Sequence, residues 1–474
     1  MSAIIITAVW GVVMMLCGAF VTDLRKPKYI AMVGVLLAIG ATAYELKMGT
    51  GLFGMDTVHI NVNNMINTTT RNLLFIIVAL SCTLLYFLLN GRDIEHVGNS
   101  VSEYFALIFF VLCGVSITST FNSLLMLFLG IEIISIPLYI LTGSDKRNLK
   151  SNEAALKYFL MGAFSTGLML LGIAFIYGGS EMGTFYISQL MLGAGKLPPM
   201  IAIGLVLLMI SMSFKVSAAP FHFWTPDVYD GAPTVFTSFM ATIVKVAGFF
   251  AFVRLFENAF GNAQAQWQTL IAIITAATLI IGNLTAVFQQ SVKRMLAYSS
   301  IAQAGFMLFA VYALNSVAKE GLVLYAAAYS VASIGIFALL VRMKDYTIDG
   351  FNGLGKTQPL LALTATIFLL SLTGIPLTAG FQAKFYMLMA AVQNTTQMGH
   401  NMWLVIVAVI CAAISAYYYF RIIQAMYFKE PAEGVVHITE ANTGYKILMI
   451  VAALITIALG VLPFVLTDWL YYNP

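Results

Sequence analysis

Long apolar stretches separated by short polar segments run through the whole chain. Fourteen of them approach the ~20 residues that a helix needs to cross a bilayer. Charges, Gly/Pro/Asn clusters or aromatic residues mark their ends, as is typical at a membrane surface. The pattern therefore predicts an all-α polytopic membrane protein. The predicted spans are 3–21, 29–46, 72–90, 101–118, 121–142, 154–177, 200–219, 235–256, 268–289, 299–315, 321–343, 360–393, 402–427 and 445–469.

Two of these spans contain residues that interrupt helices. In the seventh span Pro220 follows Lys215, and in the twelfth span Gly374 and Pro376 precede Lys384. Proline lacks the amide hydrogen that a helix needs and clashes with the preceding turn. Both spans should therefore unwind locally and leave backbone carbonyls free at membrane depth, where they need buried water or ions.

The positions of the two breaks predict an internal symmetry. They lie five spans apart, and because five is odd, the two broken helices should cross the membrane in opposite directions. This is typical of inverted repeats, whose transport site lies near the bilayer midplane. We expect a single membrane domain over 1–474. Its predicted parts are three N-terminal helices in 1–100, a first repeat of spans 4–8 in 101–256, a second repeat of spans 9–13 in 268–427 and a C-terminal helix in 428–474.

Composition supports the membrane class. Apolar residues make up 60% of the chain and charged residues only 9%, whereas soluble domains carry about 25% charged residues. The basic residues do not cluster beside aromatic groups, which argues against a nucleic-acid partner. All four cysteines fall inside predicted spans without a C-x-x-C pair or neighbouring histidines. We therefore expect neither disulfides nor a metal site.

The distribution of Lys and Arg predicts the orientation. If the N-terminus is outside, sixteen of the 24 Lys and Arg residues lie in inner loops or at inner helix ends, five lie at outer ones and three lie within spans. The positive-inside rule favours this arrangement, with both termini on the outer side.

The three lysines within spans are the main functional candidates, because an ammonium group in hydrocarbon costs several kcal/mol. They are Lys215, Lys245 and Lys384, and a carboxylate, Glu132, lies in the middle of the fifth span. Glu132 needs a cation from another span, and we expect that cation to be Lys215. Moving such a partner can switch a buried lysine between its charged and neutral forms. We therefore expect a proton relay from Lys215 through Lys245 to Lys384. The alternative is an ion pair that only locks helices together.

Several further residues have two readings. Lys157 either supports the relay or extends its ammonium group to the inner surface. Lys293 has a gating role or is an ordinary positive-inside residue, and His222 is either a proton shuttle or the cap of an interrupted helix. Gln303 can hold a connecting water. Asp227 is expected to bind backbone amides and shape its turn.

Five segments together resemble subunit N of the proton-pumping NADH:quinone oxidoreductase, respiratory complex I, within its antiporter-like family. They stand in the order known for that family and cover roughly spans 5–12. Lys384 in the twelfth span and the lack of a long C-terminal lateral helix argue against the sister subunits M and L. The segments are Gly130–Tyr139, Glu153–Phe164, Phe214–Thr234, Val292–Ala302 and Gly374–Phe385.

The resemblance implies roles for these residues. Glu132 would be the glutamate of the fifth helix, Lys215 and Lys245 the lysines of the seventh and eighth, and Lys384 the exit residue of the twelfth. Lys157 would be the lysine of the sixth helix. Many relatives have histidine where this chain has Gln303, so a histidine link is not expected at that point.

The resemblance also implies the setting. The chain would bind no cofactor of its own, while FMN, iron–sulfur clusters and quinone would belong to partner subunits. Its partners would be the neighbouring membrane subunits, the hydrophilic redox arm and the lipids of a bacterial inner membrane. Quinone reduction elsewhere would shift the Glu132–Lys215 pair and drive a proton outward. Two alternatives remain open: a subunit of a multisubunit sodium/proton antiporter, and a structural spacer that moves no protons.

Overall fold

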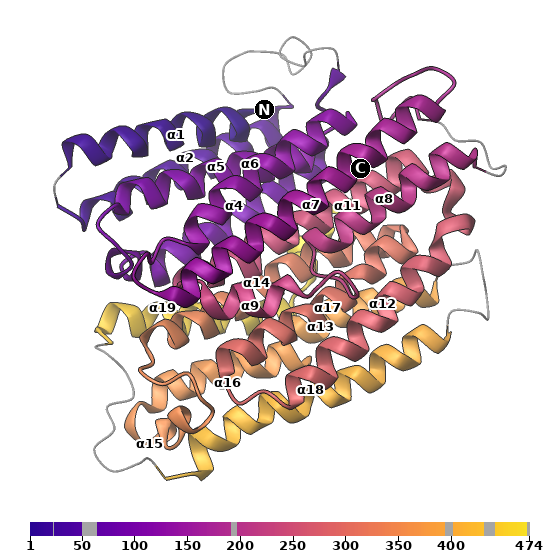
Figure 1. Ribbon diagram of the computed structural model, residues 1–474. Coiled ribbons are helices and arrows are strands. Elements are labelled where there is room, and N and C mark those ends of the chain that lie inside the picture. Colours follow the sequence, from indigo (N-terminus) through magenta and orange to yellow (C-terminus); the bar gives the residue numbers. More distant parts are fainter. Residues whose placement is uncertain (22, 50–63, 191–196, 394–401, 431–440, 472–474) are drawn as a thin grey trace.

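The computed structural model describes residues 1–21, 23–49, 64–190, 197–393, 402–430 and 441–471. In these ranges all regular secondary structure is helical, apart from isolated bridges such as Ile66–Phe121. The predicted all-α class is therefore confirmed. Figure 1 shows the long helices side by side, with α1 and α2 at one edge, α18 at the other and α14 between them.

The helices are named in chain order. They are α1 (Ser2–Phe20), α2 (Lys26–Met48), α4 (Thr70–Asn90), α5 (Val101–Thr120), α6 (Leu124–Thr142), α7 (Leu149–Gly179), α8 (Pro199–Lys215), α9 (Trp224–Gly231), α10 (Thr234–Phe239), the π-helical η3 (Met240–Val244), α11 (Lys245–Phe260), α12 (Gln264–Val287), α13 (Val292–Ala313), α14 (Ser316–Arg342), α15 (Leu354–Thr357), α16 (Pro359–Thr373), α17 (Ala379–Val392), α18 (Met402–Phe428), α19 (Thr443–Val461) and α20 (Phe464–Tyr471). Short 3-10 turns lie at Asp93–His96, Gly261–Ala263 and Asp349–Phe351.

Each predicted span contains at least one helix, but the number of membrane crossings stays a prediction. Among the described residues, 11 helical stretches are long and apolar enough to cross a membrane. One of them, Thr234–Val287, joins the predicted eighth and ninth spans into 54 residues. The helices α8 and α16 are too short for that criterion, since each ends at a break.

Side-chain caps set several helix ends that hydropathy does not reveal. The hydroxyl of Ser291 accepts a hydrogen bond from the amide of Arg294, so α13 begins at Val292 rather than at the predicted residue 299. Lys293 and Arg294 were expected in a loop between spans. They belong instead to the first turn of α13, and Lys293 is only 4% exposed.

Among the membrane-length helices of the described residues, α13 and α14 are the most deeply buried. The most apolar windows of α13 and α14 are 94% and 100% buried, whereas those of α1 and α18 are 22% and 33% buried. Glycine allows the closest helix contacts, because a Cβ atom at Gly282 of α12 would lie 2.6 Å from the amide nitrogen of Ala302 in α13. The central helices α13 and α14 therefore form a rigid frame for residues that they carry.

Both predicted helix breaks are present. The chain leaves helical geometry between Lys215 and Trp224, and again between Thr373 and Ala379. Each break contains a residue other than glycine in the left-handed region, Ser217 at φ 64° and Leu377 at φ 72°. Left-handed backbone is costly for such residues and is concentrated at functional sites.

Candidate functional site

Lys215 and Glu132 are connected through a hydroxyl group. The hydroxyl of Thr166 in α7 donates to Oε1 of Glu132 at 2.8 Å and lies 3.4 Å from Nζ of Lys215. Nζ of Lys215 also donates to the hydroxyl of Ser135 at 3.0 Å. Among the described residues no direct ion pair joins Lys215 to a carboxylate, so the predicted Glu132–Lys215 contact is replaced by a bridge.

A small cavity of about 30 Å³ lies beside Lys215. Such a volume exceeds the ~10–15 Å³ that one water molecule requires. Its wall includes Ser135, Val244 and Gly248, and the last two lie on either side of Lys245 in the chain, at the end of η3 and in α11. A Cβ atom at Gly248 would lie 3.1 Å from Val216, so the glycine lets α11 approach the break. The cavity is therefore large enough for a water molecule between Lys215 and the helix that carries Lys245.

In the break after α8 and at the helix ends beside it, several buried polar atoms have no hydrogen-bond partner among the described residues. They are the hydroxyl oxygens of Ser213, Ser217 and Thr225 and Nδ1 of His222. Buried polar atoms are almost always hydrogen-bonded, to water when no protein group is available. The side chain of His222 does not cap α9, which begins without a side-chain cap. The break and the helix ends beside it thus offer four polar atoms that water could bind.

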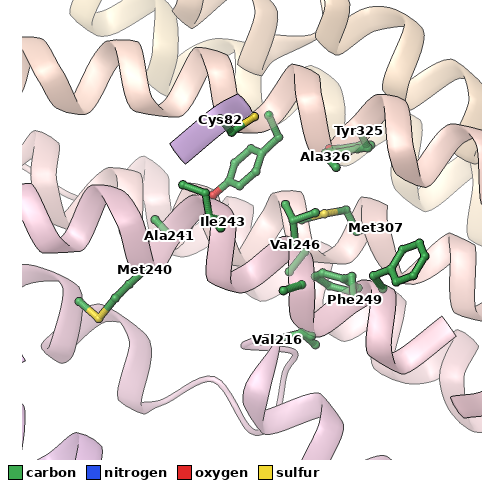
Figure 2. Packing of buried hydrophobic residues seen from close by; sticks show 14 of the residues in the cluster. Cys82, Val216, Met240, Ala241, Ile243, Val246, Phe249, Met307, Tyr325 and Ala326 are labelled. Atoms are coloured by element: carbon green, nitrogen blue, oxygen red, sulfur yellow. The ribbon is translucent and has the colours of Figure 1, made fainter. Parts of the chain in front are cut away.

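Lys245 lies at the start of α11, directly after the π-helical η3. Its Nζ donates to the backbone oxygen of Ser300 at 3.1 Å and to the Ser300 hydroxyl at 2.8 Å. The side chain is only 2% exposed. Figure 2 shows apolar side chains on both sides of this lysine in the chain, with Val246 and Phe249 packed near Met307. Ser300 of α13 is therefore the main polar neighbour of Lys245.

Lys384 closes the end of the interrupted helix α16. Its Nζ donates to the backbone oxygens of Leu372 and Thr373 at 2.9 and 2.7 Å. These carbonyls belong to the last turn of α16, where they have no partner within the helix. The ring of Phe306 lies 4.7 Å from the ammonium group, within cation–π range. The freed carbonyls predicted at this break are thus satisfied by the buried lysine.

Gln303 and two tyrosines connect the neighbourhoods of Lys245 and Lys384. The amide nitrogen of Gln303 donates to the Leu372 oxygen at 2.8 Å and lies 3.4 Å from the hydroxyl of Tyr419. Tyr325 donates to Oε1 of Gln303, and Tyr419 is hydrogen-bonded to Ser299. Ser299 precedes Ser300, the partner of Lys245, on the same helix. Both ends of the Gln303 amide bond directly to protein groups, and the expected water at this residue stays a prediction.

A second charged group lies around α9. The carboxylate of Asp227 forms ion pairs with Nζ of Lys157 at 2.9 Å and with Nη2 of Arg294 at 3.1 Å. Lys157 also pairs with Glu153 at 2.8 Å. The expectation that the carboxylate of Asp227 binds backbone amides is wrong, because two cations occupy it. Lys293 is buried, and its Nζ donates to the backbone oxygens of residues 230 and 232.

All three lysines within the predicted spans are held by uncharged oxygen atoms in the described part of the chain. Hydroxyls hold Lys215, a hydroxyl and a carbonyl hold Lys245, and carbonyls hold Lys384. An NH₃⁺ group and an NH₂ group can both donate to such oxygens, so these contacts can persist when the proton leaves. No group of three or more His, Cys, Asp or Glu side chains among the described residues could hold a metal ion.

The sequence identified the charged residues but not the groups that bind them. Thr166, Ser300 and Asp227 were missed as partners. Ser135 was detectable, because it lies three residues after Glu132 and therefore on nearly the same helix face. Thr166 and Ser300 gave no comparable signal, since hydroxyl residues are common in apolar helices and bond to the preceding turn.

Comparison with known proteins agrees with this architecture. Residues 121–415 match the family model of the NADH:quinone oxidoreductase/Mrp antiporter transmembrane region. NADH-quinone oxidoreductase subunit N of Cytophaga hutchinsonii is 41% identical over 395 residues, covering 82% of this chain and 84% of that protein.

Solved structures extend the similarity to the fold. A chain of respiratory complex I from Thermus thermophilus with bound aureothin has a TM-score of 0.81 and 30% identity, with 98% of each chain covered. A chain of the Mrp complex from a Dietzia species has a TM-score of 0.83 at 18% identity, covering 99% of this chain and 95% of that chain, and this similarity concerns the fold alone. This multi-pass membrane protein therefore belongs to the NADH:quinone oxidoreductase/Mrp antiporter family and, within it, to the N subunits of NADH-quinone oxidoreductase.

Proposed function

We propose that this chain moves protons across the membrane through Lys215, Lys245 and Lys384, driven by quinone reduction in partner subunits. The observation that carries the proposal is the series of uncharged partners that holds these three buried lysines. An amine bound in this way can lose and regain a proton without a change of partner. Buried ionisable residues in membrane helices are functional sites by default.

The proposed path has two sections, one before and one after Lys245. Water in the cavity beside Lys215 would carry the proton towards α11, the helix that carries Lys245. Beyond Lys245, Ser300 and the hydrogen-bonded pair Ser299–Tyr419 would line the way to Lys384, and Gln303 would hold its end through the shared Leu372 carbonyl. Water between these groups would carry the proton, because an amide and a carbonyl do not relay it. Glu132 would set the field at Lys215, because the Thr166 hydroxyl touches both groups. Lys157 and Lys293 would shape the path from outside, and His222 would bind water near its start.

The surroundings follow from the same proposal. The chain would sit in a bacterial inner membrane with both termini on the periplasmic side and with two inverted repeats around the lysines. Its neighbours would be other membrane subunits of complex I and the hydrophilic redox arm. FMN, iron–sulfur clusters and quinone would be bound by those partners and not by this chain.

Substitution of Lys215 tests the proposal. In the intact complex reconstituted into vesicles, Lys215→Ala should abolish or sharply reduce proton pumping and slow the coupled quinone reduction. Lys150→Ala, at an exposed lysine near the start of α7, is the matched control and should pump normally. Normal pumping by Lys215→Ala would leave this chain as a spacer without a proton path.

The second candidate is a subunit of a sodium/proton antiporter without a redox partner. The similarity in fold to a chain of the Mrp complex favours keeping this candidate. Copurification distinguishes the two functions. Flavin and iron–sulfur proteins in the purified complex support the redox-driven pump, whereas sodium-dependent proton exchange in their absence supports the antiporter.

A further inference from the structure

Asp227 joins three helices at one carboxylate. It lies on α9 and binds Nζ of Lys157 from α7 through Oδ2 at 2.9 Å and Nη2 of Arg294 from α13 through Oδ1 at 3.1 Å. One cation thus comes from the predicted first repeat and the other from the predicted second. With both oxygens occupied, α9 is tied to both halves of the chain.

Lys293, the residue before Arg294 in α13, binds the C-terminal end of α9. Nζ of Lys293 donates to the backbone oxygens of Asp230 and Ala232 at 2.8 and 2.6 Å. These oxygens lie at the C-terminal end of α9, where carbonyls lack helical partners and attract a cation. Consecutive residues of α13 therefore hold α9 near both of its ends.

Helix α9 in turn contacts both lysine neighbourhoods. The indole nitrogen of Trp224 donates to the backbone oxygen of Phe214 at 3.0 Å, next to Lys215. The ring of Tyr229 lies 5.6 Å from the ammonium group of Lys245. Thr225, one of the buried residues with a free hydroxyl, also belongs to α9. A displacement of α9 would therefore change the surroundings of both lysines.

We infer that Asp227 is a positioning residue of the proton path: its two ion pairs fix α9, and α9 sets the surroundings of Lys215 and Lys245. The inference rests on the proposed function for its consequence in pumping, but the fixation of α9 is a separate physical statement. Asp227 does not carry the proton. It keeps the interrupted segment in register with the helices on both sides.

Hydrogen exchange tests the fixation without turnover. In the purified complex, Asp227→Asn should speed amide exchange in α9 by about fivefold, since local opening becomes easier once the pairs are lost. Asp227→Glu keeps the charge and should restore most of the protection. Asp230→Asn makes the same change on the same helix, where the carboxylate has no hydrogen bond or ion pair among the described contacts and acts on Lys293 only through its charge, and should speed exchange far less than Asp227→Asn. Unchanged exchange in Asp227→Asn would overturn the inference.

Pumping per assembled complex tests the consequence. Asp227→Asn should lower the pumping rate about fivefold at unchanged complex abundance, and Asp227→Glu should recover it. Should Asp227→Asn fail to assemble, Lys157→Gln and Arg294→Gln each remove one pair and should give smaller effects of the same kind. Faster exchange with full pumping would overturn the positioning role. That result differs from failure of the proposed function, which normal pumping in Lys215→Ala would reveal.

Discussion

Lys384 and Gln303 donate to the same backbone oxygen, that of Leu372, at 2.9 and 2.8 Å. A carbonyl oxygen has two lone pairs and can accept both hydrogen bonds at once. The oxygen is available because α16 ends one residue later, at Thr373. The helix break therefore joins a buried cation of α17 to an amide of α13 without an intervening carboxylate.

Replacing Gln303 by methionine should interrupt this junction. The substitution keeps the volume but removes the amide, so the hydroxyl of Tyr325 loses its acceptor and the Leu372 oxygen loses a donor. A buried polar group left unsatisfied costs about 1–3 kcal/mol. We expect lower thermal stability together with slower proton pumping per assembled complex.

Gln268→Met is the control for that experiment. Gln268 is also buried and donates to a backbone oxygen, that of Tyr312, but it touches none of the three lysines. The Gln268→Met complex should be less stable but should pump protons at the normal rate. Equal pumping in both variants would remove Gln303 from the path.

Thr166→Val should remove the hydroxyl bridge between Glu132 and Lys215. Valine has nearly the shape of threonine but cannot bridge the carboxylate and the ammonium group. We expect the complex to assemble and its pumping rate to fall about tenfold, which corresponds to ~1.4 kcal/mol, measured as proton uptake in vesicles. Ser165→Ala is the matched control, because Ser165 bonds to Ser211 of α8 and leaves the bridge intact. Equal losses in both variants would indicate a general weakening of the α7–α8 contact.

The sequence predicted the helices and both breaks because their causes are local. Apolar stretches specify membrane helices, and Pro220, Gly374 and Pro376 specify interruptions. Helix boundaries were less accurate where a cap decides them, as at Ser291, since one hydroxyl extends α13 over residues that hydropathy assigns to a loop. The π-helical turn before Lys245 has no distinctive sequence pattern.

The site was predictable only in part, for a physical reason. A charge within an apolar stretch is conspicuous, so Lys215, Lys245 and Lys384 could be found. Their partners could not, because a buried ammonium group accepts any well-placed oxygen, and tertiary packing decides which one is near. Asp227 illustrates the limit: a loop carboxylate near a turn reads as a local cap, yet its partners come from α7 and α13.

Lys384→Arg tests whether residue 384 must give up its proton or only carry a positive charge. Arginine keeps a cation near the end of α16, but it does not lose its proton in proteins, and its planar group fits the two carbonyls less well. We expect an assembled complex that pumps protons poorly. Lys356→Arg, at an exposed surface ion pair with Glu430, is the control and should pump normally. Normal pumping by Lys384→Arg would show that Lys384 acts only as a fixed charge.

The two ion pairs of Asp227 should weaken at acidic pH. Burial would raise the pKa of Asp227, but the hydrogen bond and charge of Lys157, followed by those of Arg294, outweigh it and lower the pKa below its ordinary value. A carboxylate whose pKa is lowered on folding stabilises the folded state above its unfolded pKa of about 3.9, and this contribution is lost as the pH falls through the lower folded value. Each pair is half-exposed, so it should contribute only ~0.2–1 kcal/mol.

The measurement is the ratio of α9 amide protection in the parent complex to that in Asp227→Asn, taken at matched pH. The ratio should stay constant from neutral pH down to about pH 4 and approach one below that. High salt should also reduce it at neutral pH, since partly exposed pairs are screened. A ratio that instead changed near neutral pH would mean that Asp227 exchanges its proton in the working range of the enzyme, as a member of the relay rather than as its support.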